Sequence, residues 1–353
     1  MARRSRKSAA RPAARRGGGV ARVFGWLLLI GLAAAGWFAW QDADHFADVP
    51  LRVGAPVVLD VPAGASFAAI RRQIREAGLS DAHDLYWRAL AQRMDVATRL
   101  KAGEYAVPVG TTPRELLRRM AAGDVIQRRF TIVEGWTFRQ LRAELANAAG
   151  VRQSLTTRSD SEIMRELGAG ADHPEGRFLP ETYTWTRGDS DLDLLRRAHQ
   201  AMTRALAETW AKRAPDLPLE SPYQALILAS IVERETGKAA ERPAIAGVFA
   251  RRLRLGMKLQ TDPTVIYGLG AAFDGNLRRR DLDTDTPYNT YTRTGLPPTP
   301  IALPGLAALE AAVRPAPGDA LYFVARGDGS HEFSPSLDAH NRAVARYQLR
   351  RTP

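Results

Sequence analysis

The chain has 353 residues with 45% hydrophobic content, which excludes a wholly disordered chain and suggests about two domains of roughly 150 residues each. The formal net charge is +12, but eight of the 50 basic residues lie at positions 3–22, and the rest of the chain carries 42 basic against 38 acidic residues. This asymmetry argues against nucleic-acid binding, and the absence of cysteine excludes disulfides, a lipoprotein anchor and a thiolate nucleophile.

The first predicted element is a transmembrane helix at residues 23–40, where no charged residue occurs. At about 1.5 Å per residue this helix comes close to the roughly 30 Å of a bilayer core. The arginine-rich flank lies only on its N-terminal side, so the positive-inside rule makes residues 1–22 a basic cytoplasmic tail. We therefore expect a single-pass membrane protein whose C-terminal bulk lies outside the cytoplasm.

A cleavable signal peptide is the alternative, because three alanines at positions 33–35 follow an apolar run. The uncharged stretch extends beyond them to Trp40 and exceeds the roughly 7–15 residues of a signal-peptide core, which favours the retained anchor.

After a predicted linker at residues 41–56, one local pattern occurs three times: an apolar strand, a Gly-x-Ser/Thr corner and an amphipathic helix. The corners begin at Gly64, Gly110 and Gly135, and the threonines of the last two have the spacing of helix N-caps. The first two copies and a helix near residues 84–94 predict a small α+β subdomain at residues 57–125. This subdomain resembles LysM-type glycan-binding domains.

A larger α+β domain is predicted over residues 126–353. Its middle carries an aromatic strand-like stretch at 178–185 and a helical pattern at 191–212. Residues 222–235 form a further predicted helix, apolar on every side from Ala225 to Val232 apart from Ser230, and therefore buried within the domain.

Two acidic residues end this apolar helix. Glu233 lies three and four positions beyond Ser230 and Ala229, on a face of small side chains with room for a ligand, whereas Glu235 points nearly the opposite way. Glu233 is thus our candidate functional carboxylate. Its ordinary alternative is a helix-end carboxylate that pairs with an arginine.

Polar and aromatic stretches follow at residues 259–268 and 286–291, and a proline-rich loop at 295–301. Amides, hydroxyls and tyrosine rings suit a neutral sugar polymer, whose hydroxyls need hydrogen-bond partners and whose rings stack on aromatics. Ordinary turn chemistry is the alternative, because Asp-Pro and Pro-Pro pairs are common in loops.

The order and spacing of these blocks resemble the YceG-like family of endolytic murein transglycosylases, from about Val57 to the C-terminus. The resemblance implies that Glu233 is the catalytic acid, that the first subdomain is LysM-like, and that the protein lies in the inner membrane and faces the periplasm. It also implies peptidoglycan glycan strands as substrate and adds peptidoglycan synthases as partners to test. The chain departs from the family at Arg234, where a lysine is expected, and in its longer basic tail.

A lytic transglycosylase is a lyase that needs only one carboxyl group, because the muramic C6 hydroxyl attacks C1 in place of water and leaves a 1,6-anhydro end. Ordinary glycosidases need a second carboxylate. A glutamate on an apolar helix is placed to have a raised pKa and to donate the proton. We assign substrate binding to five further residues and expect no metal and no cofactor: Gln260, Thr261, Asp262, Tyr288 and Asn289.

Two rival functions remain. A metal hydrolase is disfavoured, because the six histidines include no HExxH motif. A non-catalytic, membrane-anchored peptidoglycan-binding scaffold of the wall-synthesis machinery would share the anchor and the first subdomain, and only an assay for anhydro-ended glycan separates it from the enzyme.

Overall fold

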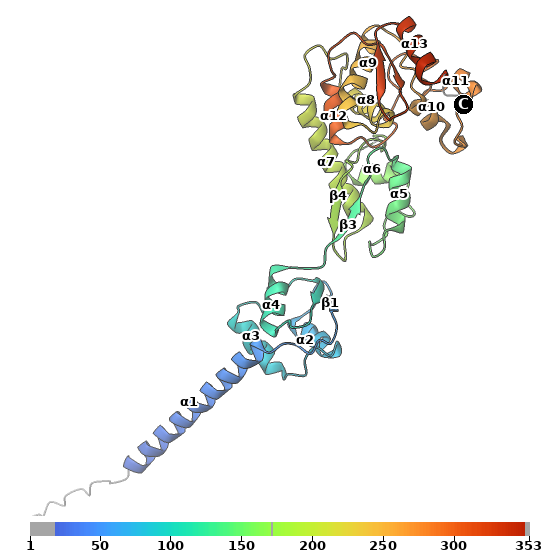
Figure 1. The fold of residues 1–353 in the computed structure, drawn as a ribbon. Helices are drawn as coiled ribbons and strands as arrows, with labels where there is room; N and C mark the ends of the chain where they lie inside the picture. The colour runs from blue at the N-terminus through green and yellow to red at the C-terminus, as the bar shows by residue number, and fades with distance from the viewer. Residues whose placement is uncertain (1–17, 171, 350–353) are drawn as a thin grey trace, which may run out of the picture. The chain divides into compact units, whose positions relative to one another are not determined.

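The computed structural model describes residues 18–170 and 172–349 (Figure 1), so positions 1–17 of the expected basic tail lie outside the described residues. The chain forms two compact units, Met1–Ile126 and Gln127–Pro353. Helices alternate with short strands in both units, which confirms the mixed α+β class. The strands form three separate two-stranded sheets, β1–β2, β3–β4 and β5–β6, all antiparallel.

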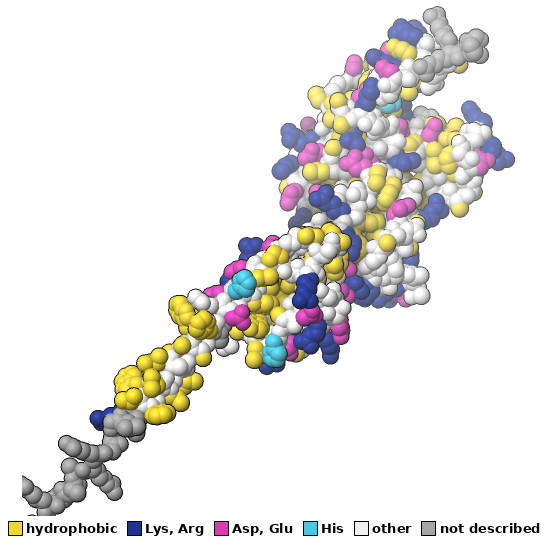
Figure 2. All heavy atoms as spheres, turned by 60° about the horizontal axis from the view of Figure 1, so that its bottom comes forward, with side chains coloured by type: hydrophobic (Ala, Val, Ile, Leu, Met, Phe, Trp, Pro, Cys, Tyr) yellow, Lys and Arg dark blue, Asp and Glu magenta, His cyan; other side chains and the backbone are white. Residues whose placement is uncertain are grey.

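The first helix, α1 (Gly18–Asp48), carries the uncharged apolar stretch of residues 23–40. It is the one helix in the described part of the chain that is long and apolar enough to cross a membrane, and it fits a single-pass anchor or a signal sequence. Its large apolar side chains between Val23 and Trp40 are exposed, as the spheres along it show (Figure 2).

Helix α1 also continues through the first half of the segment expected to be a linker. Its last turns pack against α3 and α4 because they carry apolar side chains that join the core of the first unit: Phe46 stacks edge-on against Trp87 at 5.2 Å. Asp44 lies 2.7 Å from Arg93. Only residues 49–56 are irregular, and even there Leu51 is buried.

The first unit places two strands and three helices around one core. In chain order these elements are β1 (Val57–Val61), α2 (Phe67–Glu76), α3 (Asp84–Arg93), β2 (Gly103–Val107) and α4 (Pro113–Ala122). The strands pair with Leu59 opposite Tyr105. The Tyr105 ring is fully buried, and its hydroxyl donates a hydrogen bond of 2.7 Å to the Lys101 carbonyl.

The three predicted strand–corner–helix units are confirmed. The corner glycines Gly64, Gly110 and Gly135 all have positive φ, a backbone conformation that other residues rarely adopt. Thr137 and Gln140 form a complete capping box at the start of α5, in which each side chain bonds the other's backbone N–H. The local sequence signals therefore define these helix starts.

The second unit begins with a helix-covered hairpin: β3 (Arg128–Thr131), α5 (Phe138–Asn147), α6 (Asp160–Glu166), β4 (Thr182–Trp185) and α7 (Asp191–Ala211). The main core of this unit surrounds α8 (Pro222–Glu235), whose bounds are those predicted from the sequence. Helix α8 packs against α7, α9 (Arg242–Arg254), α10 (Asp262–Leu269) and α12 (Leu306–Val313). Every residue of α8 from Ala225 to Glu233 is buried. The remaining elements are the short helices η1 (Ala239–Glu241), η2 (Gly270–Ala272) and α11 (Arg279–Asp283), the strands β5 (Tyr322–Ala325) and β6 (His331–Ser334), and α13 (Leu337–Tyr347).

Candidate active site

Glu233 lies near the end of α8 in an ion pair. Its Oε1 accepts a hydrogen bond of 2.8 Å from Arg242 Nη2, and its Oε2 accepts one of 2.8 Å from the backbone N–H of Gly305. Its side chain is 4% exposed, and that of Arg242 is 10% exposed. Glu233 thereby ties α8 to the starts of α9 and α12.

The small side chains on this face of α8 are covered by the chain itself. Ala229 and Ser230 are fully buried. The backbone N–H of Ile301 donates a hydrogen bond of 3.0 Å to Ser230 Oγ, so the proline-rich loop occupies the space expected for a ligand.

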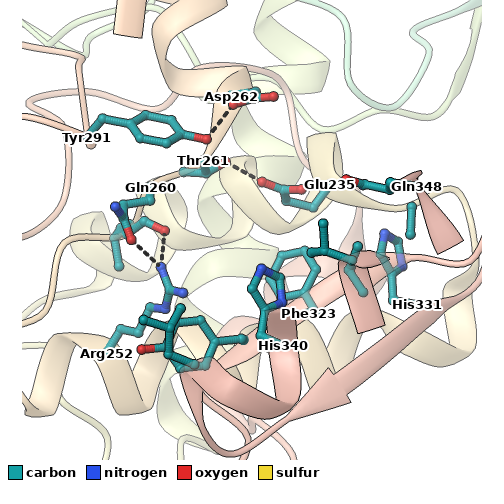
Figure 3. A pocket seen from close by; sticks show the side chains of 16 residues that line it. Glu235, Arg252, Gln260, Thr261, Asp262, Tyr291, Phe323, His331, His340 and Gln348 are labelled. Carbon is teal, nitrogen blue, oxygen red and sulfur yellow. Dashed lines mark hydrogen bonds between the residues drawn. The ribbon is translucent and has the colours of Figure 1, made fainter. Parts of the chain in front are cut away.

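Glu235 lies on the opposite side of the helix, as the 3.6-residue period requires, and lines a cavity of about 460 Å³ (Figure 3). The cavity is built from the end of α8, the segment before α10, and the β5–β6 hairpin with α13. The other labelled side chains around it in Figure 3 are Arg252, Gln260, Thr261, Asp262, Tyr291, Phe323, His331, His340 and Gln348.

The surroundings of Glu235 favour its protonated form. Burial is the main cause that raises the pKa of this carboxyl, and the nearby charge of Asp262 raises it further. A hydrogen bond from the Thr261 hydroxyl and the electrostatic influence of His331 and Arg252 oppose the rise. On balance the pKa of Glu235 is raised, as a general acid at neutral pH requires.

Three of the five predicted substrate-binding residues line the same cavity: Gln260, Thr261 and Asp262. Gln260 has a φ of +51°, which is uncommon for a residue other than glycine. Its N–H donates to the Thr290 carbonyl at 3.1 Å, and Tyr291 donates its hydroxyl hydrogen to Asp262 Oδ1 at 2.5 Å. The 289–291 segment therefore fixes the segment that faces Glu235.

The other two predicted binding residues do not line this cavity. Asn289 is fully buried, and its side-chain amide donates hydrogen bonds to the carbonyls of Leu282 at 2.9 Å and Thr284 at 2.7 Å. The Tyr288 hydroxyl lies 2.9 Å from Thr299 Oγ1, and its ring packs edge-on against Tyr267 at 5.0 Å. Both side chains hold loops in place.

The remaining walls of the cavity carry positive and ionisable groups that the sequence reasoning did not select. Arg252 donates from Nη1 to the Leu259 carbonyl at 2.8 Å, and its guanidinium lies 5.0 Å from the Tyr322 ring centroid. His331 Nδ1 lies 2.7 Å from Glu241 Oε2. Within residues 18–170 and 172–349, no group of three His, Asp or Glu side chains is placed to hold a metal ion.

Comparison with known proteins agrees with this architecture. The model of the YceG-like family matches residues 59–346. An endolytic murein transglycosylase of Bacillus subtilis (strain 168) is 30% identical over 308 residues, which span 82% of this chain and 84% of that protein. One of Streptococcus pneumoniae serotype 2 (strain D39 / NCTC 7466) is 27% identical over 351 residues, 90% of this chain and 63% of that protein.

A crystal structure of a YceG-like protein from Listeria monocytogenes matches with a TM-score of 0.52 and 28% identity. The match covers 81% of this chain and 98% of that one. Because the family model spans well over half of the sequence and the fold agrees, this chain belongs to the YceG-like family.

Proposed function

We propose that this protein is a peptidoglycan lytic transglycosylase, a lyase that cleaves the MurNAc–GlcNAc bond within glycan strands and leaves 1,6-anhydro-MurNAc ends. The names of the B. subtilis and S. pneumoniae relatives support the reaction class. Cleavage of strands as they are made would end their elongation.

One observation carries the proposal: a glutamate with a raised pKa lies in a polar cavity at the end of a buried helix. That glutamate is Glu235, whereas Glu233 is neutralised by Arg242 on the far side of the helix. We therefore assign the acid role to Glu235, although the sequence pattern favoured Glu233. The two carboxyls can be separated experimentally, since they face different surroundings.

The mechanism follows from one carboxyl group. Protonated Glu235 donates its proton to the glycosidic oxygen, and the C1–O bond breaks as positive charge develops on the muramic ring. The ring's C6 hydroxyl then forms a bond from O6 to C1, and the Glu235 carboxylate takes the hydroxyl proton. The enzyme returns to its starting state and no water is consumed. The Asp262 carboxylate, held by Tyr291, is placed to stabilise the transient positive charge.

The sugar itself is held by groups that suit hydroxyl and N-acetyl partners. The Gln260 amide is fixed by an unusual backbone conformation and by Arg252, whose Nη1 lies 3.5 Å from Gln260 Oε1. A side chain held before the substrate arrives loses less entropy on binding. Gln260 and Asp262 thus form the proposed sugar-binding edge of the cavity.

We further propose that α1 stays attached as a single-pass inner-membrane anchor, with both units in the periplasm. The apolar span and the basic residues before it support this orientation. The first unit is the proposed LysM-like subdomain, since its strands and helices follow the order β1, α2, α3, β2. Peptidoglycan synthases are proposed partners, because they supply nascent strands.

The test is mass spectrometry of the products that the detergent-solubilised chain releases from intact glycan in ¹⁸O-water. We expect 1,6-anhydro ends without label in the wild type. Glu235→Gln should lose about 10²–10⁴-fold in rate, the usual contribution of general acid–base catalysis. Label at a reducing end would show hydrolysis, and near-normal activity of Glu235→Gln would reject the assigned acid.

A further inference from the structure

A second cavity, of about 480 Å³, lies in the same unit and has no role in the proposed chemistry. It is lined by the start of α5, the turn that carries Glu175, the end of α8 and the helix α10. The side chains that matter below are those of Arg139, Glu175, Arg234, Pro263, Ile266 and Phe273.

Two exposed arginines give this cavity its charge. Within the described part of the chain, neither Arg139 nor Arg234 lies within ion-pair distance of a carboxylate. Among the described residues, Arg234 donates a hydrogen bond to the carbonyl of Gly135 alone, at 3.2 Å. A neutral sugar requires no cation, whereas a carboxylate binds best to such guanidinium groups.

The rest of the lining is apolar around one buried acid. Ile266, Pro263 and Phe273 offer surface for methyl groups. Glu175 is 3% exposed and accepts hydrogen bonds from the Phe138 N–H at 2.9 Å and the Tyr267 hydroxyl at 3.1 Å. Burial raises the pKa of Glu175 to about 7, so a large fraction of this group is neutral near pH 7 and repels a bound carboxylate only weakly.

Residues adjacent in the sequence line the second cavity and the cavity that holds Glu235. Arg234 lines one cavity and Glu235 the other, and Pro263 and Asp262 divide in the same way. Adjacent Cα atoms are about 3.8 Å apart, and a five-residue peptide reaches about 17 Å when extended. A short peptide attached to a sugar in the Glu235 cavity is therefore long enough to span the separation of these paired lining residues.

We propose that the second cavity binds the carboxylate-bearing stem peptide attached to the muramic sugar being cleaved, with Arg139 and Arg234 holding its carboxylates. This rests on the proposed function and adds a substrate requirement to it. The alanine methyl groups of such a peptide contact the apolar lining. Glycan with charged peptides is then the preferred substrate.

The experiment compares two strand preparations that differ only in charge: peptide-bearing strands, and the same strands with their peptide carboxylates converted to amides. The wild-type chain should cleave the charged strands about tenfold faster or more, since a hydrogen bond between charged groups is worth that factor. The double variant Arg139→Gln/Arg234→Gln should bring the ratio of the two rates close to one. The double lysine variant should retain part of the preference.

The matched control is Arg314→Gln, which removes an exposed arginine at the end of α12 that lines neither cavity. It should keep the wild-type ratio. Equal rates on both strands in the wild type, or an unchanged ratio in the double glutamine variant, would reject the proposal.

A binding measurement separates this proposal from the proposed function. Calorimetry with Glu235→Gln compares a soluble disaccharide-peptide with its amidated form and needs no turnover. The proposal is supported if Glu235→Gln binds the charged form more tightly and if adding Arg139→Gln/Arg234→Gln removes this difference. This result would support peptide binding in the second cavity even if no anhydro product is found. Equal binding rejects it even if cleavage occurs.

Discussion

Glu233 and Arg242 form a buried ion pair in which Oε1 lies 2.8 Å from Nη2. Arg242 also lies 3.1 Å from Glu134, whose carboxylate lies against Gly305. A side chain at position 305, where the backbone N–H donates to Glu233, would have to displace the end of the half-exposed Glu134 side chain. The hydrogen bonds from Arg242 and the Gly305 N–H use both carboxylate oxygens of Glu233, and we therefore expect a structural role for this residue.

Glu233→Gln should therefore lower stability more than catalysis. An amide has one acceptor oxygen, so either Arg242 or the Gly305 N–H would face an NH₂ group. Removing one partner of a buried ion pair costs about 3–5 kcal/mol, and the retained hydrogen bond places the expected loss at about 2–4 kcal/mol.

Thermal unfolding measures the loss of stability in Glu233→Gln, and the cleavage rate per folded molecule measures the loss of catalysis. The control is Glu208→Gln, because Glu208 is exposed on α7. A melting temperature unchanged in Glu233→Gln, together with a rate that falls as far as in Glu235→Gln, would return the acid role to Glu233.

Asn289→Ala should also destabilise the fold. The buried amide of Asn289 bonds the carbonyls of Leu282 and Thr284, and its oxygen accepts from the Tyr291 N–H at 2.8 Å. Leaving these buried groups unpaired costs about 1–3 kcal/mol each, which predicts a clear drop in melting temperature. If the variant instead kept wild-type stability and only KM rose, Asn289 would act on substrate as the sequence pattern suggested.

The sequence predicted much of the fold because its signals were local. The N-cap at Thr137, the corner glycine Gly135 and the bounds of α8 each depend on residues within one turn of the chain. The helical continuation of α1 to Asp48 could not be read in this way. It depends on Phe46 packing against Trp87, a contact between residues far apart in sequence.

The candidate site was only partly predictable for the same reason. The helix period correctly showed that Glu233 and Glu235 face opposite sides of α8. It could not show which of the two sides is filled by other side chains and which lines a cavity. Arg242 closes one side, and Thr261 with the β5–β6 hairpin forms the cavity on the other. His331, 90 positions from its partner Glu241, gave no sequence signal beyond being a histidine.

Glu175 should make stability depend on pH. Its pKa is raised from 4.5 to about 7 in the folded state, so the folded chain holds a proton that the unfolded chain releases. The stabilisation is complete below about pH 4.5 and is lost as the pH rises to about 7, by about 3 kcal/mol.

Glu175→Gln should remove this dependence, because a glutamine oxygen still accepts from the Phe138 N–H and its NH₂ can donate to the Tyr267 hydroxyl. Melting temperatures between pH 4.5 and 8 measure it, with Glu235→Gln alongside because that carboxyl also has a raised pKa. The idea fails if wild type and Glu175→Gln lose stability in parallel.

Both units should be accessible from outside the inner membrane. The basic residues precede the apolar span, and by the positive-inside rule this predicts that the C-terminal side lies in the periplasm. Protease added to spheroplasts should remove the large C-terminal part, while a cytoplasmic control protein stays intact. If the full-length chain survived while periplasmic control proteins were cut, the orientation in the membrane would be the opposite of the predicted one.

Finally, the pH profile of cleavage should respond to the two neighbours of Glu235 in opposite directions. An acid must be protonated to act, so kcat falls as the pH rises through the pKa of Glu235, which burial has raised above its usual 4.5. Thr261 stabilises the carboxylate by a hydrogen bond, so Thr261→Val should raise that pKa and move the falling limb to higher pH. Asp262 disfavours the carboxylate of Glu235 by its charge, so Asp262→Asn should move the falling limb to lower pH.

Both variants should also be slower, but only the position of the falling limb tests whether Glu235 is the acid. Glu208→Gln serves as the control and should leave the limb in place. Because Glu233 contacts neither Thr261 nor Asp262, a limb that stays fixed in both variants would show that Glu235 is not the acid.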